Sequence, residues 1–129
     1  MKSETLVITS SSGKTEISTE IALTPADQEM GLMYRTSIGD NAGMLFIYPH
    51  PQTITMWMHN TYVALDMVFM SHDGAVTRIV ANAEPLSDKV ISSGGPATAV
   101  LELKGGTAQR IGLNPGDHIE SAALRAGSP

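Results

Sequence analysis

The stretch Ile-Ser-Thr-Glu-Ile-Ala-Leu, residues 17–23, decides the fold class of this chain. Its alternate residues, starting at Ile17, share one face of an extended strand, and those starting at Ser18 share the other, as in a half-buried strand. A second β-rich run covers residues 6–8, and the polar loop over residues 10–14 contains a glycine that can adopt a positive φ. We therefore expect an antiparallel β-hairpin near the start of the chain.

Turn signals extend this pattern along the rest of the chain. Asp73-Gly74 between two β-rich runs predicts a second hairpin. Pro49-His50-Pro51 is expected to end a strand, and residues 83–97 are expected to form a long polar connection. The strands expected beyond the first hairpin are residues 43–48, 54–58, 65–70, 75–82, 99–103 and 118–119.

A short helix is predicted after the first hairpin. Thr24 can accept a hydrogen bond from an unpaired backbone N–H, and Pro25 suits the first helical position. We expect this helix to run to about Tyr34, with Gly31 inside it allowing another backbone to approach closely. One further helical turn is expected over residues 105–111.

The length and composition describe one domain. The chain has 129 residues, of which 42% are hydrophobic and 16% charged, and it is long enough to bury a core. We expect a single β domain over residues 1–120 and a disordered tail over residues 121–129. Because strands and helices do not alternate, the expected fold class is mainly β, a compact antiparallel β-barrel or two-sheet sandwich with one short helix near residues 25–34.

The charge and the absence of cysteine exclude several classes of function. A net charge of −5 without a run of Lys or Arg argues against a nucleic-acid partner. The apolar runs are too short to span a bilayer, so no stable membrane insertion is expected. Without cysteine, the chain has no disulfide, no thiolate nucleophile and no Cys-ligated zinc. We expect no cofactor and no metal site.

The segment between residues 56 and 66 is the candidate site, because it holds the only Trp together with several groups that bond or titrate. The strand pleat should place Trp57 and His59 on one face. We expect Trp57 to anchor the core; the alternative is that its ring forms a stacking wall for a flat or sugar-like ligand. Asn60 and Thr61 are expected to cap a turn, because both side chains can bond their own backbone.

Three carboxylates outside or at the end of this segment need partners or solvent. Asp66 lies in an apolar strand, so we expect Arg35 or a cluster of backbone amides to satisfy it, unless a polar ligand shares these groups. Glu102 faces away from its apolar neighbours in the strand, and we expect it to point outward into solvent, with a place in the ligand site as the alternative. Asp117, after a glycine, is expected to fix a turn.

Six short motifs lie in order along about residues 16–120 and together carry a resemblance. They are Gly31-Leu32-Met33-Tyr34-Arg35, Gly43-Met44-Leu45-Phe46, Trp57-Met58-His59-Asn60-Thr61, Leu65-Asp66, Val100-Leu101-Glu102-Leu103 with Gly106, and Gly116-Asp117. In these motifs the chain resembles the bacterial and archaeal family called "domain of unknown function 192". The resemblance implies a β-barrel or sandwich and, because many members carry export signals, an envelope or secreted location. It implies no activity.

Two residues depart from the pattern of that family. This chain has His59 where the family usually has Lys, and Ala64 where it usually has Pro. Lysine is a fixed cation at neutral pH, whereas histidine changes its charge in the physiological range. A mechanism that requires a permanent ammonium at this position is therefore not expected here.

Three functions are consistent with the sequence. The first is a non-catalytic, envelope-located binding or accessory domain for a small polar or sugar-like ligand or a protein partner. Its candidate ligand-binding residues are Arg35, Trp57, His59, Asn60, Asp66 and Glu102. The second is a hydrolase-like enzyme in which His59 acts with Asp66 or Glu102. The third is copper handling through Met and His side chains.

The start of the chain bears on its location. Met1-Lys2-Ser3-Glu4 leads directly into a strand-like run, as in a mature chain whose export signal has been removed. We therefore expect a periplasmic or secreted protein, and a cytoplasmic location stays open.

Overall fold

The computed structural model describes residues 1–126, and its first two strands form the expected hairpin. Strand β1 (Lys2–Ser10) pairs antiparallel with β2 (Gly13–Ala22), and Leu6 lies opposite Ile17 in the register. Ile17, Thr19 and Ile21 are buried, which confirms the half-buried strand over residues 17–21; β2 ends at Ala22, which is also buried, and Leu23 is exposed. Gly13 in the connecting turn has φ +102°, a conformation that favours glycine.

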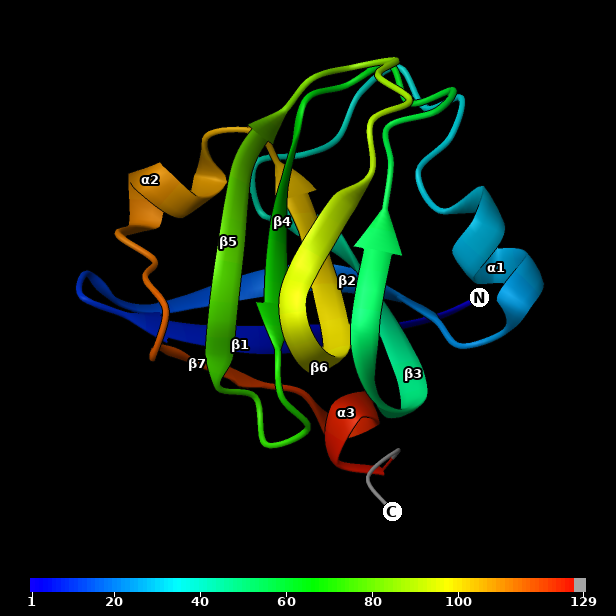
Figure 1. Cartoon of the computed structure of the whole chain (residues 1–129). Coiled ribbons are helices and arrows are strands. Elements are labelled where there is room, and N and C mark those ends of the chain that lie inside the picture. The colour runs from blue at the N-terminus through cyan, green and yellow to red at the C-terminus, as the bar shows by residue number, and fades with distance from the viewer. Residues whose placement is uncertain (127–129) are drawn as a thin grey trace.

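Seven strands form one sheet in the order β5-β4-β6-β3-β2-β1-β7, and only the β2–β3 pair is parallel. An isolated bridge between Ala75 and His118 brings the two edges together, so the sheet curls into a half-barrel (Figure 1). The mainly β, antiparallel fold class is confirmed. The remaining elements are α1 (Pro25–Met30), β3 (Ala42–Met56), β4 (Leu65–Met70), β5 (Val76–Ala83), β6 (Ile91–Lys104), α2 (Thr107–Ile111), β7 (His118–Glu120) and α3 (Ala122–Ala126).

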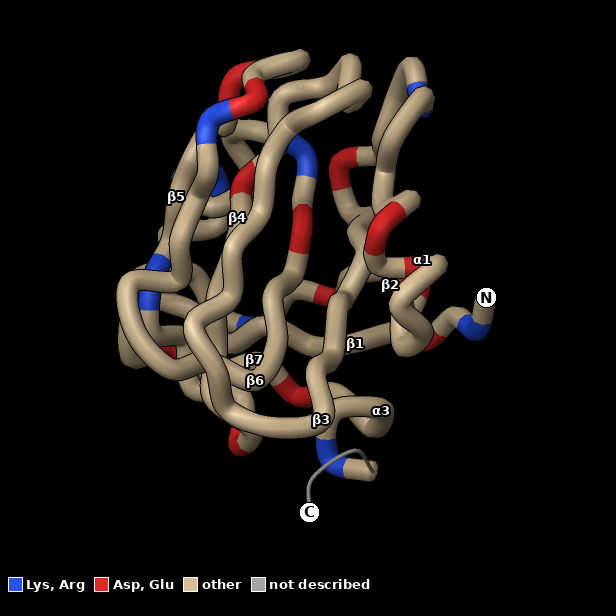
Figure 2. Tube along the Cα trace, turned by 45° about the vertical axis from the view of Figure 1, so that its right-hand side comes forward, with Lys and Arg blue, Asp and Glu red and all other residues tan. Residues whose placement is uncertain are grey.

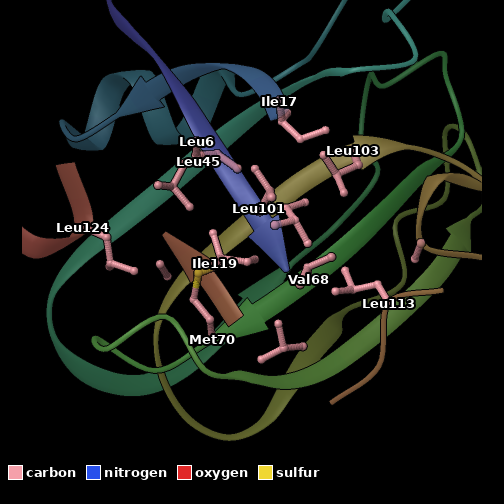
Figure 3. Packing of buried hydrophobic residues seen from close by; sticks show 14 of the residues in the cluster. Leu6, Ile17, Leu45, Val68, Met70, Leu101, Leu103, Leu113, Ile119 and Leu124 are labelled. Atoms are coloured by element: carbon pink, nitrogen blue, oxygen red, sulfur yellow. The ribbon is translucent and has the colours of Figure 1, made fainter. Parts of the chain in front are cut away.

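Apolar side chains cover both faces of the central strands. One cluster fills the concave side and includes Leu6, Leu45, Leu101 and Leu103 (Figure 3). A second cluster covers the opposite face of β3, β4 and β6 and joins them to Leu32 after α1. The central strands therefore have no solvent-facing side over most of their length, unlike the first hairpin.

Strands β3 and β6 are longer than the sequence predicts. Pro49-His50-Pro51 does not end a strand: β3 continues through it to Met56 as one bent strand. The prolines are tolerated because this part of β3 pairs only with β6 and its register shifts between Ile47 and Gln52. The long connection predicted over residues 83–97 is correspondingly shorter, because β6 already begins at Ile91.

Helix α1 begins as predicted and ends earlier. The Thr24 hydroxyl accepts a hydrogen bond from the Asp27 N–H at 3.1 Å. The helix stops at Gly31, which has φ +48° and caps it, so the predicted extension to Tyr34 is wrong. A Cβ on Gly31 would lie 3.3 Å from Cζ of Phe46, so the close approach is to an aromatic side chain and not to a backbone.

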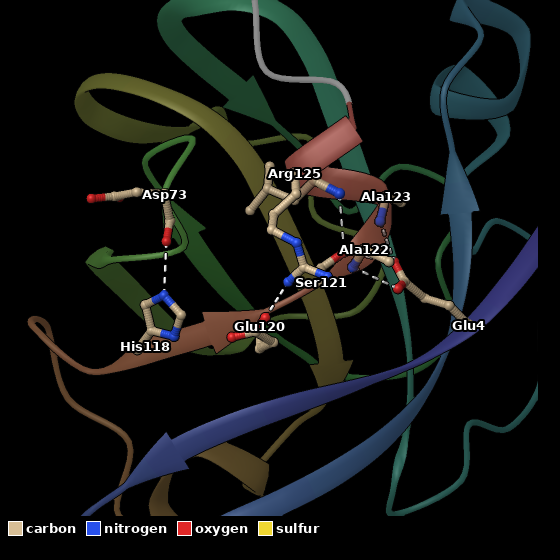
Figure 4. A network of polar contacts seen from close by, with 9 residues as sticks. Glu4, Asp73, His118, Glu120, Ser121, Ala122, Ala123 and Arg125 are labelled. Carbon is tan, nitrogen blue, oxygen red and sulfur yellow. Dashed lines mark hydrogen bonds and ion pairs between the residues drawn. The ribbon is translucent and has the colours of Figure 1, made fainter.

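The C-terminal segment is also more ordered than the sequence predicts. Residues 122–126 form α3, and Leu124 is buried in the first cluster. Glu4 on β1 fixes the start of this helix, because its carboxylate accepts hydrogen bonds from the Ser121 hydroxyl and the Ala122 and Ala123 N–H groups (Figure 4). The expected disordered tail from residue 121 therefore does not describe residues 122–126, and residues 127–129 lie outside the described part of the chain.

Candidate functional site

A cavity of about 250 Å³ lies between α1 and the second face of strands β3 and β6. Gln28 ties α1 to the sheet at its edge, because its side-chain amide donates to the carbonyls of Ala22 at 3.1 Å and Ile47 at 2.8 Å. The cavity is thus formed by elements that are hydrogen-bonded to one another. Its lining residues are Gln28, Glu29, Met30, Gly31, Leu32, Met33, Phe46, Tyr48, Thr55, Met56, Trp57, Thr61 and Glu102.

Glu102 lies at the buried end of this cavity. It is in the middle of β6, in register with Met44 on one side and Met67 on the other, and only 4% of its surface is exposed. The prediction of an outward, solvated Glu102 is wrong. The side chain does face away from Leu101 and Leu103, but that face of β6 is covered by the second apolar cluster.

The Glu102 carboxyl has no partner of its own. It makes no ion pair with the described residues, and no described side-chain oxygen is both fully enclosed and without a hydrogen bond. Its oxygens therefore reach the space of the cavity instead of ending in packed core. A buried carboxyl without a partner is rare, because burial disfavours its charged form.

Burial controls the acid–base behaviour at this end of the cavity. It raises the pKa of Glu102 from an ordinary 4.5 to about 8, so the group is mostly protonated at neutral pH. Tyr48, across the cavity, also has a raised pKa, first from its own burial and then from the nearby charge of Glu102. The Tyr48 hydroxyl lies 3.9 Å from the Met56 sulfur, and both residues line the cavity.

Trp57 forms part of the cavity rim. Its surface is 49% exposed, so the expectation that it anchors the core is wrong. The indole stacks on the His59 ring with centroids 4.6 Å apart and an interplanar angle of 26°, which confirms that the two side chains lie together. The Nδ1 atom of His59 lies 2.7 Å from a carboxylate oxygen of Asp88, and this pair stands at the surface.

A second, shallower hollow of about 470 Å³ adjoins the cavity. The two share Glu29, Met30, Met33 and Trp57, so they are continuous along α1. The outer hollow is completed by Ala26, Tyr34, His59 and Asn60.

The chain turns sharply between Trp57 and Thr61. Asn60 has φ +54°, and its side-chain amide donates to the Tyr34 hydroxyl at 2.8 Å. The Thr61 hydroxyl donates to the His59 carbonyl at 3.1 Å. The predicted turn role is confirmed for Thr61, whereas Asn60 lies in the turn but bonds Tyr34 and not its own backbone. The turn holds Tyr34 and His59 beside the outer hollow.

Asp66 is satisfied by backbone amides. Its carboxylate accepts from the N–H groups of Asn82 at 2.8 Å, Gly106 at 3.2 Å and Ala108 at 2.8 Å. It therefore joins β5 and the start of α2 to β4, as the amide-cluster alternative predicts. Asp117 likewise fixes its turn, because it accepts from the Asn114 N–H at 2.8 Å.

Arg35 does not pair with Asp66. Its guanidinium donates two hydrogen bonds to the carboxylate of Glu20 on β2, and the longer of them is 3.0 Å. This hydrogen-bonded pair lowers the pKa of Glu20 and lies at the surface, with 41% of the Arg35 side chain exposed. The predicted pair of Arg35 with Asp66 is wrong. The sequence alone does not tell which acidic residue of a curled sheet lies next to the segment after α1.

The six sequence-derived candidates therefore fall into three groups. Trp57 and Glu102 line the cavity, while His59 and Asn60 join Trp57 around the outer hollow. Asp66 and Arg35 line neither space. Sequence reasoning missed Tyr48, Glu29 and Asp88; Tyr48 could have been noticed as the hydroxyl-bearing end of an otherwise apolar strand, whereas the other two carry no sequence signal.

The hydrolase alternative pairs His59 with Asp66 or Glu102, and among the described residues neither carboxyl bonds His59. Asp66 is bound to three amides and His59 is bound to Asp88, so neither is directed at the other. Among the described residues, no group of three His, Asp or Glu side chains is placed to hold a metal ion. No helix of the described chain is long and apolar enough to cross a membrane.

The fold and the cavity define a small, mainly antiparallel β protein in which the buried carboxyl of Glu102 lines a cavity of about 250 Å³. The model of the family domain of unknown function 192, described as an uncharacterized ACR, matches residues 7–121. The chain belongs to this family.

Two solved structures are similar to this chain over nearly its whole length. A candidate transcription regulator from Sinorhizobium meliloti 1021 is 40% identical, with a TM-score of 0.91 over 94% of this chain and 95% of that one. A protein of unknown function from Novosphingobium aromaticivorans DSM 12444 is 41% identical, with a TM-score of 0.89 over 92% of this chain and 85% of that one. The search of curated proteins gave no match.

Proposed function

We propose that this protein is a non-catalytic binding domain that takes a small ligand into the cavity between α1, β3 and β6. One observation carries the proposal: Glu102 is buried in a central strand, makes no ion pair with the described residues and lines the cavity. A carboxyl in that position costs stability unless something completes its interactions. Buried polar groups at the end of an otherwise apolar pocket are typical of ligand sites.

The size and lining of the cavity support a small ligand or a small head group. A volume of about 250 Å³ is below the range of about 300–1,000 Å³ typical of pockets for drug-sized molecules. The adjoining hollow over Trp57 and His59 can accommodate any larger remainder of the ligand. An exposed Trp at the mouth offers apolar contact at a low cost in conformational entropy, because it has two side-chain torsions.

A blocking variant tests the proposal directly. Thr55 lines the cavity and is exposed on β3, so Thr55→Phe should fill the mouth without disturbing the core. Thr53→Phe is the matched control, because Thr53 is exposed on the same strand and does not line the cavity. A fragment mixture is titrated into ¹⁵N-labelled protein, and amide shifts at Met30, Trp57 and Glu102 are expected for wild type and Thr53→Phe but not for Thr55→Phe. Fragments that shift residues elsewhere only, or equally in all three proteins, refute the proposal.

The description of the Sinorhizobium meliloti protein as a transcription regulator suggests a second function, and the charge distribution of this chain argues against direct contact with nucleic acid. Figure 2 shows Lys and Arg spread over many elements, and the net charge is −5. A surface without a basic stripe is poorly suited to neutralise phosphates. If this chain has a regulatory role, ligand sensing through a protein partner therefore fits it better than direct contact with nucleic acid.

An envelope or secreted location belongs to the proposal and rests on the family resemblance. It is tested by fractionating cells of the source organism that express the protein from its own gene. Recovery in the periplasm or medium supports the location, and recovery with cytoplasmic markers contradicts it.

A further inference from the structure

The residues that line the cavity limit the chemical class of ligand that it can bind. Its charged lining residues are both acidic: Glu102 at the buried end and Glu29 on α1 at the mouth. No Lys, Arg or His is among the residues that line it. An anionic ligand would therefore meet two carboxyl groups and no positive charge.

The apolar part of the lining suits a cation as well as it suits a neutral group. Phe46, Tyr48 and Trp57 all line the cavity, and aromatic rings attract a cation placed over their faces. The thioethers of Met30 and Met56 add soft, polarisable surface that needs no hydrogen bond. A bare metal ion fits less well, because no group of three His, Asp or Glu side chains is gathered in the described chain.

We propose that the cavity binds the ammonium group of a small organic amine, with the Glu102 carboxylate as its counter-ion and the aromatic side chains around it. This inference rests on the proposed function and names the class of its ligand. An ammonium would give Glu102 an ion-pair partner, which it does not have among the described residues, and the second carboxyl at the mouth would favour its approach.

The proposal has a characteristic dependence on pH. Glu102 is protonated in the free protein up to pH values near its pKa of about 8, so a cation must displace that proton when it binds. The titratable groups that face it across the cavity are Tyr48 on β3 and Glu29 on α1. Because the ionised fraction of Glu102 increases about tenfold from pH 6 to pH 7, the affinity for a cation should increase about tenfold over the same interval. A neutral hydrogen-bond acceptor would instead lose affinity as the carboxyl ionises.

The experiment uses three probes of nearly equal size and different charge: n-butylammonium, 1-butanol and butyrate. Each is titrated into the full chain at pH 6, 7 and 8, with Trp57 fluorescence and isothermal calorimetry as readouts. We expect n-butylammonium to bind most tightly at pH 8, to weaken about tenfold from pH 7 to pH 6, and to release protons at pH 7. Glu102→Gln should lower the affinity for n-butylammonium at least about tenfold at pH 8, and that affinity should no longer depend on pH. Glu16→Gln, an exposed carboxylate on β2, should change neither result.

The outcomes separate this inference from the proposed function. Tighter binding of 1-butanol or butyrate at the cavity overturns the ammonium inference and leaves the binding function intact. Equal binding of n-butylammonium to wild type and Glu102→Gln overturns the inference in the same way. If none of the three probes binds while the fragment mixture also leaves the cavity amides unshifted, both the inference and the proposed function are overturned.

Discussion

The burial of Glu102 predicts a specific dependence of stability on pH. The pKa of this carboxyl is about 8 in the folded protein, against an ordinary 4.5 that applies to the unfolded chain. Above pH 4.5 the unfolded state loses the proton that the folded state retains, so this group makes the free energy of unfolding fall as the pH rises. The fall continues until the pH passes the folded pKa, near pH 8, where both states are ionised.

The size of the effect follows from the two pKa values. Integrating the difference in bound protons between pH 5 and pH 8 gives a loss of roughly 3–4 kcal/mol from this one group. Glu102→Gln keeps the shape of the side chain and cannot ionise, so it should show no such loss. The stability of Glu102→Gln relative to wild type should therefore rise by roughly 3–4 kcal/mol over that interval, whatever the offset between the two proteins at pH 5.

Urea unfolding at several pH values between 5 and 8 measures this difference, with far-ultraviolet circular dichroism and Trp57 fluorescence as the probes. Other titrating groups cancel in the comparison, because both proteins share them. Glu16→Gln is the control and should run parallel to wild type, since Glu16 is exposed. A wild-type curve that stays parallel to that of Glu102→Gln within about 1 kcal/mol would refute the argument that this carboxyl is held in a desolvated place.

Four further predictions follow from the other polar contacts. Asp66→Ala should destabilise the protein by about 3 kcal/mol or more in urea unfolding, because it leaves three buried or partly buried N–H groups without their acceptor; a loss below about 1 kcal/mol would contradict that role. Arg35→Ala should cost at most about 1 kcal/mol and less in high salt, because its ion pair with Glu20 is exposed; a larger loss that is insensitive to salt would count against a surface pair. Glu4→Ala should increase amide hydrogen exchange in residues 122–126 far more than in β4, because its carboxylate holds the start of α3; unchanged exchange there would show that α3 docks without it. Trp57→Leu should change stability by less than about 1 kcal/mol and weaken ligand binding, because the side chain is half exposed at the rim; the reverse pattern would make Trp57 a core residue.

Local sequence signals predicted the hairpins and the fold class well. Alternation in residues 17–23 and the Asp73-Gly74 turn depend on neighbouring residues only, and both are reproduced in the structure. The Thr24 cap belongs to the same class of local signal. The ends of β3 and β6 were not predicted correctly. A proline is tolerated where its strand pairs on one side only, and the pairing of a strand depends on the assembled sheet.

The candidate site was only partly predictable for the same reason. Strand alternation gave the correct facing of Glu102 relative to Leu101, yet it cannot tell whether the opposite face meets solvent or a second layer. The second layer includes Leu32 after α1 and Met58 in the turn after Trp57, which are distant in sequence from β6. The partners of Arg35, Asp66 and His59 likewise depend on which segments the curled sheet brings together.

The carboxyl resonance of Glu102 offers the most direct test of the central claim. Its ¹³Cδ shift is followed from pH 4 to pH 10 in protein labelled at glutamate and assigned with Glu102→Gln, first without ligand and then with n-butylammonium. We expect a midpoint near 8 in the free protein and a clear shift of that midpoint to lower pH when the cation is present. A midpoint near the ordinary 4.5 would contradict the burial of an unpartnered carboxyl, and a midpoint near 8 that n-butylammonium leaves in place would contradict its role in binding the cation.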